Sequence, residues 1–127
     1  MPDTSILIAD DDVDVLTALT LRCEQLGLRV RIAHDAMAAL LMIRADPPGL
    51  VIIDVNMPGG NGLSVCEMLG SDKSWQRVPS IILTGQSDED TIARCHRAGA
   101  CYVPKGGDVW QRVRPLLSTL LRIAAER

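Results

Sequence analysis

Two acidic segments of the chain carry residue types that could do chemistry. In one, the apolar run Ile6–Ala9 leads directly into the carboxylates of Asp10–Asp12. In the other, Val51–Ile53 ends on Asp54, and a Pro/Gly-rich turn follows at once. Carboxylates held close together repel one another unless a divalent cation lies among them, and their hard oxygen atoms suit Mg²⁺. The pattern therefore predicts a small acidic metal site.

Strand-like and helix-like patterns alternate along the chain, and these elements must position the carboxylates. The expected strands are Ser5–Ala9, Leu28–Ala33, Leu50–Asp54, Ser80–Thr84 and Cys101–Val103. The expected helices cover residues 13–26, 35–45 and 63–69, then run from Ser87 or Asp88 to Ala98 and from Asp108 onward. Short loops between such elements indicate βαβ units. We therefore expect an α/β fold in which helices cover both faces of a five-stranded parallel sheet.

Four of the five expected strands supply a polar side chain at their carboxyl ends, where parallel sheets bind ligands. These side chains belong to Asp10–Asp12, Asp54, Thr84 and Lys105. We expect them to meet in one site. Plainer interpretations exist, because Asp10–Asp12 could cap the following helix and Asp54 could be a turn residue. Thr84 and Lys105 could equally be an ordinary strand end and a solvated loop lysine.

Composition limits the class of protein. The 127 residues are 47% hydrophobic and 23% charged, which is typical of one soluble globular domain over residues 1–127. A net charge of −3 argues against nucleic acid or an anionic membrane as the main partner. No apolar run approaches the roughly 20 residues that span a bilayer, and the N-terminus lacks a secretory pattern, so we expect a cytoplasmic protein. The four cysteines lack metal-binding spacing and are interpreted as small buried apolar residues.

Four segments taken together resemble the receiver domain of bacterial two-component response regulators. They are Ile8–Asp12, Asp54–Gly62, Leu83–Gly85 and Gly99–Lys105, and the resemblance extends over nearly the whole chain. It implies a flavodoxin-like sheet with strand order 2-1-3-4-5. It also implies a phosphoacceptor that is not an enzyme, with no catalysis beyond its own phosphorylation and dephosphorylation.

The resemblance assigns the acidic residues to phosphoryl transfer. Asp54 would be the phosphoacceptor, taking the group from a phosphohistidine of a sensor histidine kinase or phosphotransfer protein. Asp11 would bind Mg²⁺ directly, together with Asp54 and the backbone carbonyl of Asn56. Asp10 would bind the metal through water. The metal would offset the negative charge that gathers on the phosphoryl oxygens.

The resemblance also implies a switch. Lys105 would pair with the phosphoryl group, and the Thr84 hydroxyl would donate to one of its oxygens. As Thr84 moves, the ring of Tyr102 would turn inward and change a partner-binding surface. Tyr102 could otherwise be an ordinary half-buried residue at a sheet edge. Asn56 and Gln86, two residues beyond Asp54 and Thr84, are hypothesised to tune the lifetime of the phosphoryl group.

Two departures from the family pattern lie near Lys105. Most receivers have Lys-Pro, commonly with a cis peptide bond, where this chain has Lys105 and Gly106. A cis bond before glycine is costly, so we expect a trans bond and a looser loop. Only Cys101 separates Ala100 from Tyr102, where two residues are usual.

The last helix has two unusual features. Pro115 lies within it and predicts a kink or a restart. Its apolar residues cover more of the circumference than one core-facing stripe requires; they are Leu116, Leu117, Leu120, Leu121, Ile123 and Ala124. The helix is either a terminal helix with some exposed leucines or a contact with a second copy, a partner or an effector domain.

Two rival functions fit part of the same pattern. A haloacid-dehalogenase-like phosphatase would use Asp10 as its nucleophile, but it would need an acidic pair after Lys105 and would leave Asp54 without a role. A pseudo-receiver would keep the fold without phosphorylation. The glycine after Lys105 favours the pseudo-receiver, whereas the intact acidic set argues against it. DNA binding by this chain is not expected, because no helix-turn-helix follows the domain.

Overall fold

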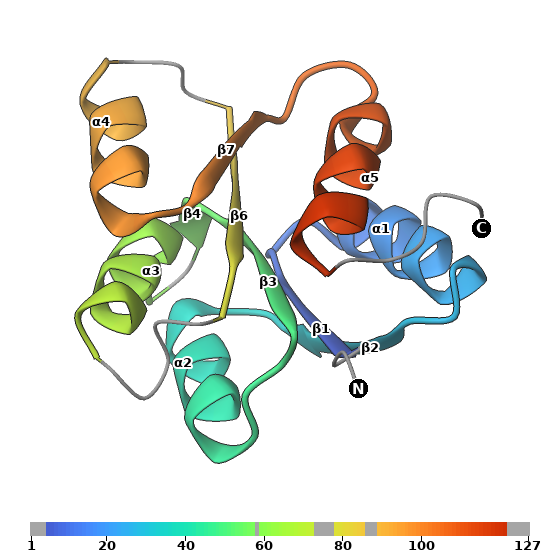
Figure 1. Cartoon of the computed structure of the whole chain (residues 1–127), viewed down its shortest axis with the longest axis horizontal. Coiled ribbons are helices and arrows are strands. Elements are labelled where there is room, and N and C mark those ends of the chain that lie inside the picture. The colour runs from blue at the N-terminus through green and yellow to red at the C-terminus, as the bar shows by residue number, and fades with distance from the viewer. Residues whose placement is uncertain (1–4, 58, 73–77, 86–88, 122–127) are drawn as a thin grey trace.

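The computed structural model describes residues 5–57, 59–72, 78–85 and 89–121. Within them, helices cover both faces of a parallel sheet (Figure 1). The strands are β1 Ser5–Ala9, β2 Arg29–Ala33, β3 Leu50–Asp54, β4 Asn56–Met57, β5 Gly60–Asn61, β6 Ser80–Thr84 and β7 Cys101–Pro104. The helices are α1 Val13–Gln25, α2 Ala36–Ala45, α3 Gly62–Ser71, α4 Glu89–Ala98 and α5 Val109–Leu120.

The main sheet confirms the expected topology. Its five strands run parallel in the order β2-β1-β3-β6-β7, which is order 2-1-3-4-5 when the short β4 and β5 are left out. The order reverses between β1 and β3, which are direct neighbours: Ile8 pairs with Ile52. A crevice outside the carboxyl ends of the strands is expected at such a reversal. Asp10 follows β1 and Asp54 ends β3, so both acidic segments lie at that point.

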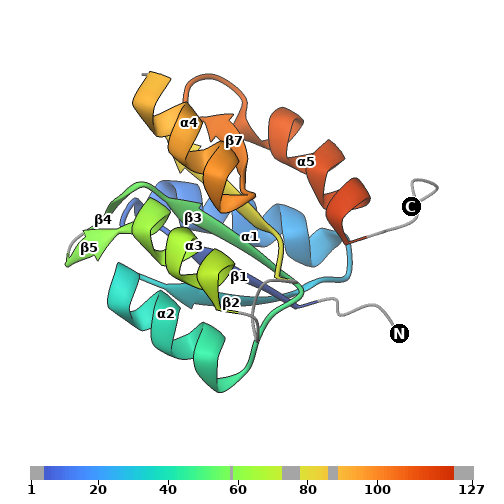
Figure 2. The same cartoon turned by 60° about the vertical axis from the view of Figure 1, so that its left-hand side comes forward.

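Two apolar cores flank the sheet, one on each face. Helices α1 and α5 cover one face, and α2, α3 and α4 cover the other (Figures 1 and 2). Successive strand residues alternate between the cores: Ile52 packs under α1 and α5, and Ile53 packs under α2 and α3. Because both faces are buried, the central strands are continuous apolar runs and not alternating ones.

The sequence signals for helix ends are confirmed. Asp12, Asp35 and Asp108 are N-caps whose carboxylates accept backbone N–H groups of the first turn. Gly27 and Gly99 have φ values of +84° and +72°, and each ends its helix in the left-handed region that glycine favours. Asp12 therefore acts as the N-cap of α1, a role that Asp10 does not have.

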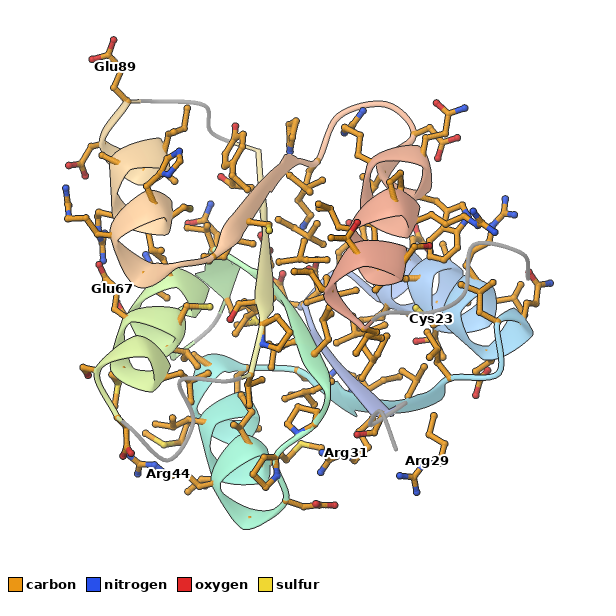
Figure 3. The ribbon with its side chains drawn as sticks, viewed as in Figure 1. Cys23, Arg29, Arg31, Arg44, Glu67 and Glu89 are labelled. Atoms are coloured by element: carbon orange, nitrogen blue, oxygen red, sulfur yellow. The ribbon has the colours of Figure 1, made fainter. Side chains whose placement is uncertain are left out.

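Strand β2 forms a polar edge of the sheet. Figure 3 labels Arg29 and Arg31 on this strand. Arg29 is exposed, and Arg31 donates a 2.6 Å hydrogen bond to the backbone carbonyl of Asp46. Charged side chains on an edge strand oppose pairing with another sheet.

The structure adds a short strand pair around Met57 and excludes one of the two alternatives predicted at Pro115, the restart. The turn after β3 contains the short antiparallel pair β4–β5. Helix α5 runs through Pro115 without a restart. Val113 and Leu117 are fully buried on either side of Pro115, so packing holds this helix across the missing backbone donor. The predicted caps Ser87 and Asp88 lie outside the described residues.

The apolar surface of α5 is less exposed than one interpretation of its sequence suggested. Leu117 and Leu121 are buried, and Leu116 and Leu120 are half-buried. Ile123 and Ala124 lie outside the described residues. In the described part of the chain, no helix combines the length and apolarity that crossing a membrane requires.

The cysteines behave as apolar core residues. Cys23, Cys66 and Cys95 are buried, Cys101 is half-buried, and all four are free thiols. Burial, together with the nearby charge of Glu24, raises the pKa of Cys23 to about 12. Burial also raises the pKa of Cys66 to about 12. These thiols are therefore protonated at neutral pH and chemically inert.

Candidate functional site

The fold brings the acidic residues together at the carboxyl edge of the sheet. Asp10 is fully buried, Asp54 is 4% exposed, and Asp11 is exposed beside them. One carboxylate oxygen from each lies within 4.8 Å of the others. Asp10 and Asp54 are positioned by the paired strands β1 and β3. The predicted cluster is therefore present, with one face open through Asp11.

Lys105 is the cation that faces the two buried carboxylates. Its ammonium Nζ lies 3.0 Å from Oδ2 of Asp10 and 3.1 Å from Oδ2 of Asp54. The residue follows β7, and its backbone N–H donates to the carbonyl of Thr84 at 2.9 Å. Its peptide bond to Gly106 is trans, as predicted. One ammonium group therefore faces two carboxylates, one that follows β1 and one that ends β3.

The site still carries an excess of negative charge. Burial and the charge of Asp10 raise the pKa of Asp54, although hydrogen bonds from Lys105 and from the backbone of Asn56 act in the opposite direction. Burial would lower the pKa of Lys105, but its bonds to Asp10 and Asp54 outweigh this, so its pKa is raised. Ionisation of Asp54 is therefore less favourable in the folded protein than in water, and a nearby cation would make it more favourable.

The donor set fits a divalent cation of the hard type. Oδ2 of Asp10 is buried and accepts no hydrogen bond, although the Lys105 ammonium is close to it. Oδ1 of Asp10 is occupied, accepting the backbone N–H of Asp12 at 2.9 Å. Carboxylate oxygens with unfilled acceptor positions are suitable ligands for such a cation. Of the three consecutive aspartates, Asp10 is a buried candidate metal ligand, Asp11 is an exposed candidate metal ligand and Asp12 is a helix cap.

Gly62 shapes the turn that follows Asp54. A Cβ atom at this position would overlap the backbone carbonyl oxygen of Asp54 and would lie 2.8 Å from Cγ1 of Ile53. Its backbone N–H donates to the carbonyl of Val55 at 3.0 Å. Only glycine permits this approach. Gly62 is part of the Asp54–Gly62 segment, but the sequence alone gives it no role. Spacing does not reveal that residues 62 and 54 are in contact.

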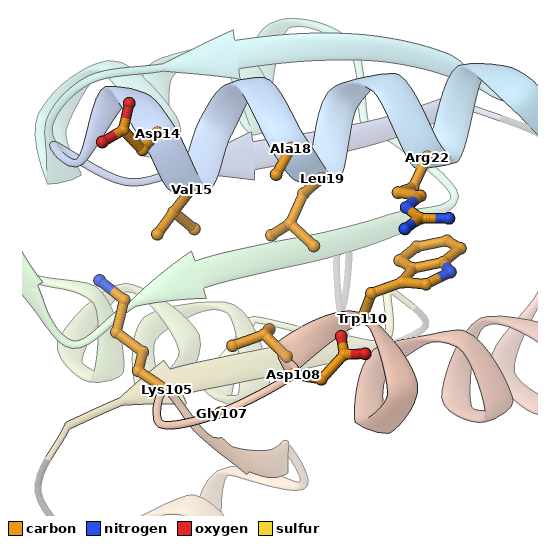
Figure 4. Close-up of a pocket in the computed structure, with 10 residues that line it drawn as sticks. Asp14, Val15, Ala18, Leu19, Arg22, Lys105, Gly107, Asp108 and Trp110 are labelled. Atoms are coloured by element: carbon orange, nitrogen blue, oxygen red, sulfur yellow. The ribbon is translucent and has the colours of Figure 1, made fainter.

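A cavity of about 340 Å³ adjoins the site (Figure 4). It lies between α1 and the start of α5, with Val15, Leu19 and Trp110 among its apolar walls. Lys105 lines it as well. Lys105 therefore faces the two carboxylates with its ammonium group and also borders this cavity.

The comparisons with known proteins identify this arrangement. The family model described as the response regulator receiver domain matches residues 6–108. The chain belongs to this family. Protein RcaC of Microchaete diplosiphon is 32% identical over 124 residues, which cover 94% of the chain and 19% of RcaC. Another curated relative, response regulator MprA of Mycobacterium ulcerans, is 36% identical and is covered to 43% of its length, so the chain spans less than half of either protein.

Solved structures agree with the family. A CheY-like response regulator receiver domain protein from Methanospirillum hungatei superposes with a TM-score of 0.84 at 25% identity, covering 98% of each chain. Response regulator TrrA from Thermotoga maritima, solved in complex with Mg²⁺ and BeF, has a TM-score of 0.81 at 25% identity. It covers 93% of the present chain and 99% of its own.

The chain is therefore a receiver domain of two-component signalling, a phosphoacceptor and not an enzyme that turns over a substrate. Receiver domains partner with histidine kinases. Its acidic cluster of Asp10, Asp11 and Asp54 is consistent with a divalent metal site. The phosphatase alternative is wrong, because the family model matches a receiver and Asp54 lies within the cluster.

Three of the four remaining predicted residues lie in the described part of the chain. Thr84 is fully buried at the end of β6, one residue beyond the partner of Asp54 in the sheet. Tyr102 on β7 is half-buried against the core beneath α2, α3 and α4. The backbone N–H of Asn56 bonds Asp54, whereas its side chain is exposed. Gln86 lies outside the described residues.

The raised pKa of Asp54 predicts how the stability of the receiver depends on pH. Without metal, Asp54 binds its proton more tightly in the folded state than in the unfolded state, so the free energy of unfolding should fall as pH rises from the unfolded-state pKa of Asp54 through its folded-state pKa. Asp54→Asn should remove this loss and raise the melting temperature at neutral pH in EDTA. Thermal melts of both proteins across this pH window test the prediction. Parallel curves for the two proteins would contradict it, and Asp12→Asn is the matched control.

Proposed function

We propose that Asp54 is the phosphoacceptor of this receiver and that Mg²⁺ is its metal. The observation that carries the proposal is that Asp54 lies in one cluster with Asp10 and Asp11 and forms an ion pair with Lys105. The buried carboxylate of Asp54 lies 3.1 Å from the ammonium group of Lys105, and the exposed Asp11 lies beside it. The relative TrrA was solved with Mg²⁺ and BeF, which supports the same metal here.

Transfer is an exchange of one bond for another. An Asp54 carboxylate oxygen attacks the phosphorus of a partner's phosphohistidine, a P–O bond forms, and the P–N bond breaks with its electron pair leaving on the imidazole. Asp11, Asp54 and the backbone carbonyl of Asn56 would hold Mg²⁺ directly, and Asp10 would hold it through water. When bound, Mg²⁺ neutralises charge that develops on the phosphoryl oxygens.

Lys105 and Thr84 would receive the new phosphoryl group. Lys105 already pairs with Asp54, so a phosphoryl group bonded to an Asp54 oxygen would place its own oxygens near the same ammonium group. The Thr84 hydroxyl would donate to another oxygen, and Tyr102 would turn inward as Thr84 moves. We propose that Asn56 and Gln86 tune the decay of the phosphorylated state; unchanged decay rates in Asn56→Ala and Gln86→Ala would contradict this.

Membership of the family supports a proposal for the partner and the cellular context. We propose a cytoplasmic receiver that takes its phosphoryl group from a sensor histidine kinase or phosphotransfer protein and binds neither nucleic acid nor membrane through residues 1–127. We propose that the last helix acts as a connector, or as a contact with an effector or a second copy, through the part of Leu116 and Leu120 that the core leaves exposed. Sedimentation with and without phosphorylation would distinguish a dimer from a monomer.

Intact mass spectrometry tests the proposed chemistry. The protein is incubated with Mg²⁺ and acetyl phosphate, and one phosphoryl group on a nucleophilic carboxylate should add about 80 Da. Asp54→Ala should show no gain. Asp12→Asn removes a neighbouring carboxylate but keeps a good helix cap, so it should be phosphorylated like wild type.

Other outcomes are equally informative. A gain that persists in Asp54→Ala would assign the phosphoryl group to another residue. A gain only with a phosphohistidine donor would keep Asp54 as the acceptor and show that the partner kinase is required. Failure with both donors, together with no Mg²⁺ binding, would favour a pseudo-receiver.

A further inference from the structure

Arg112, on the first half of α5, reaches back to the segment that carries Lys105. Its Nη2 atom donates to the backbone carbonyl of Pro104 at 2.8 Å and also to that of Gly106. These carbonyls belong to the residues immediately before and after Lys105. We propose that Arg112 is a positioning residue that holds Lys105 in place for phosphoryl transfer. The inference rests on the proposed function of Asp54 and Lys105.

The segment after Lys105 has little constraint of its own. Gly106 and Gly107 follow it, and glycine has more backbone freedom than any other residue. Gly107 has a φ of +68°, and a Cβ atom at Gly106 would meet no other atom within 4 Å. An external tie is therefore needed if Lys105 is to keep one position.

Arg112 supplies that tie together with the sheet. The backbone N–H of Lys105 bonds the carbonyl of Thr84 at 2.9 Å. With the two bonds from Arg112, the backbone is fixed at Lys105 and on both sides of it. Both bonds come from Nη2, which carries two N–H donors in the fixed plane of the guanidinium and can therefore bridge two carbonyls.

The conformation of the Arg112 side chain leaves one of its hydrogen-bond donors buried, which lowers stability. Its Nε is buried and has no hydrogen-bond partner among the described residues. A buried donor without a partner is destabilising. The position of the guanidinium is therefore better explained by its bonds around Lys105 than by the stability of α5.

The position of the Lys105 backbone determines where the ammonium group lies. Nζ is within 3.0 to 3.1 Å of Asp10 and Asp54, and charge-assisted bonds of this kind depend strongly on distance. A backbone that drifts would spread the ammonium over many positions. The loss would appear in the rate of transfer to Asp54 and would act through Lys105.

A double-mutant cycle separates positioning from a general structural effect. The rate of phosphoryl uptake from acetyl phosphate with Mg²⁺ is measured for wild type, Arg112→Gln, Lys105→Gln and the double variant. Arg112→Gln should be about tenfold slower than wild type, because small misplacements of a reacting group can cost up to about 100-fold. In the Lys105→Gln background the same change should have no further effect. Equal slowing in both backgrounds would overturn the proposal.

Rescue and control variants sharpen the test. Gly106→Ala stiffens the backbone at a position with open space, so it should restore part of the rate of Arg112→Gln. No restoration at all would count against positioning. Arg29→Gln removes one positive charge from the exposed end of β2 and should leave the rate unchanged. A rate loss in this control would indicate an effect of net charge.

A second cycle does not depend on phosphorylation. Urea unfolding of the same four proteins in EDTA should give less than additive losses, with a coupling of about tenfold in the folding equilibrium constant. Additive losses would overturn the proposal. If wild type takes up no phosphoryl group, the proposed function fails while this cycle still decides the role of Arg112. If Arg112→Gln does not fold, Arg112→Lys replaces it in both cycles.

Discussion

Lys105→Gln is expected to lower the free energy of unfolding by about 2–3 kcal/mol at neutral pH in EDTA. Removing one partner of a buried ion pair leaves an uncompensated charge, and here two carboxylates depend on one ammonium. Complete burial would give a larger loss, but the Lys105 side chain is 22% exposed, so solvent screens part of it. Urea denaturation with EDTA measures the loss.

Added Mg²⁺ should reduce this loss, because a divalent cation can neutralise the carboxylates that Lys105 leaves behind. Arg31→Gln is the matched control. The Asp46 carboxylate is 82% exposed at 3.8 Å, and the hydrogen bond from Arg31 to the Asp46 carbonyl is exposed as well, so the change should cost only about 1 kcal/mol. Equal losses in the two variants, or a Lys105→Gln loss that Mg²⁺ does not alter, would contradict the charge balance described for this site.

Gly62→Ala is expected to lower the free energy of unfolding by about 3 kcal/mol or more. The added methyl group would overlap the backbone carbonyl of Asp54, and backbone cannot move aside as a flexible side chain can. The turn would have to shift away from β3, which should also slow phosphoryl uptake. Denaturation curves and the mass assay measure the two effects.

Gly85→Ala is the control for a glycine at the same edge of the sheet. A Cβ atom there would meet nothing within 4 Å, and no positive φ is required. The change should therefore alter stability by less than about 0.5 kcal/mol. If Gly62→Ala were tolerated equally well, the close approach of residues 62 and 54 would not be needed for folding.

The acidic cluster could be predicted because its signals are local. Strand-type runs ending in Asp10 and Asp54 determine which edge of a parallel sheet carries them, whatever the details of packing. The same holds for Thr84 and Lys105, which end or follow strands. Caps such as Asp12 and Asp35 were predictable for a similar reason, since the bond spans only two or three residues.

Other features depend on contacts that a sequence pattern does not specify. The reach of Arg112 to Pro104 and Gly106 depends on one side-chain conformation across a loop. Two-residue strands such as β4 and β5 are too short to show periodicity. Pro115 left a kink and a restart of the last helix as alternatives, and the burial of Val113 and Leu117 on either side of it favours a continuous helix over a restart.

The rate at which the buried thiols react can be used to measure unfolding of this protein. Cys23 lies in the core beneath α1 and α5, whereas Cys66 and Cys95 lie in the core on the opposite face. Because burial suppresses their ionisation, an alkylating reagent should modify them only when their own layer opens. Half-buried Cys101 provides the reference rate. Peptide-level mass analysis after a short labelling pulse would therefore distinguish which helical layer detaches first in any of the variants above.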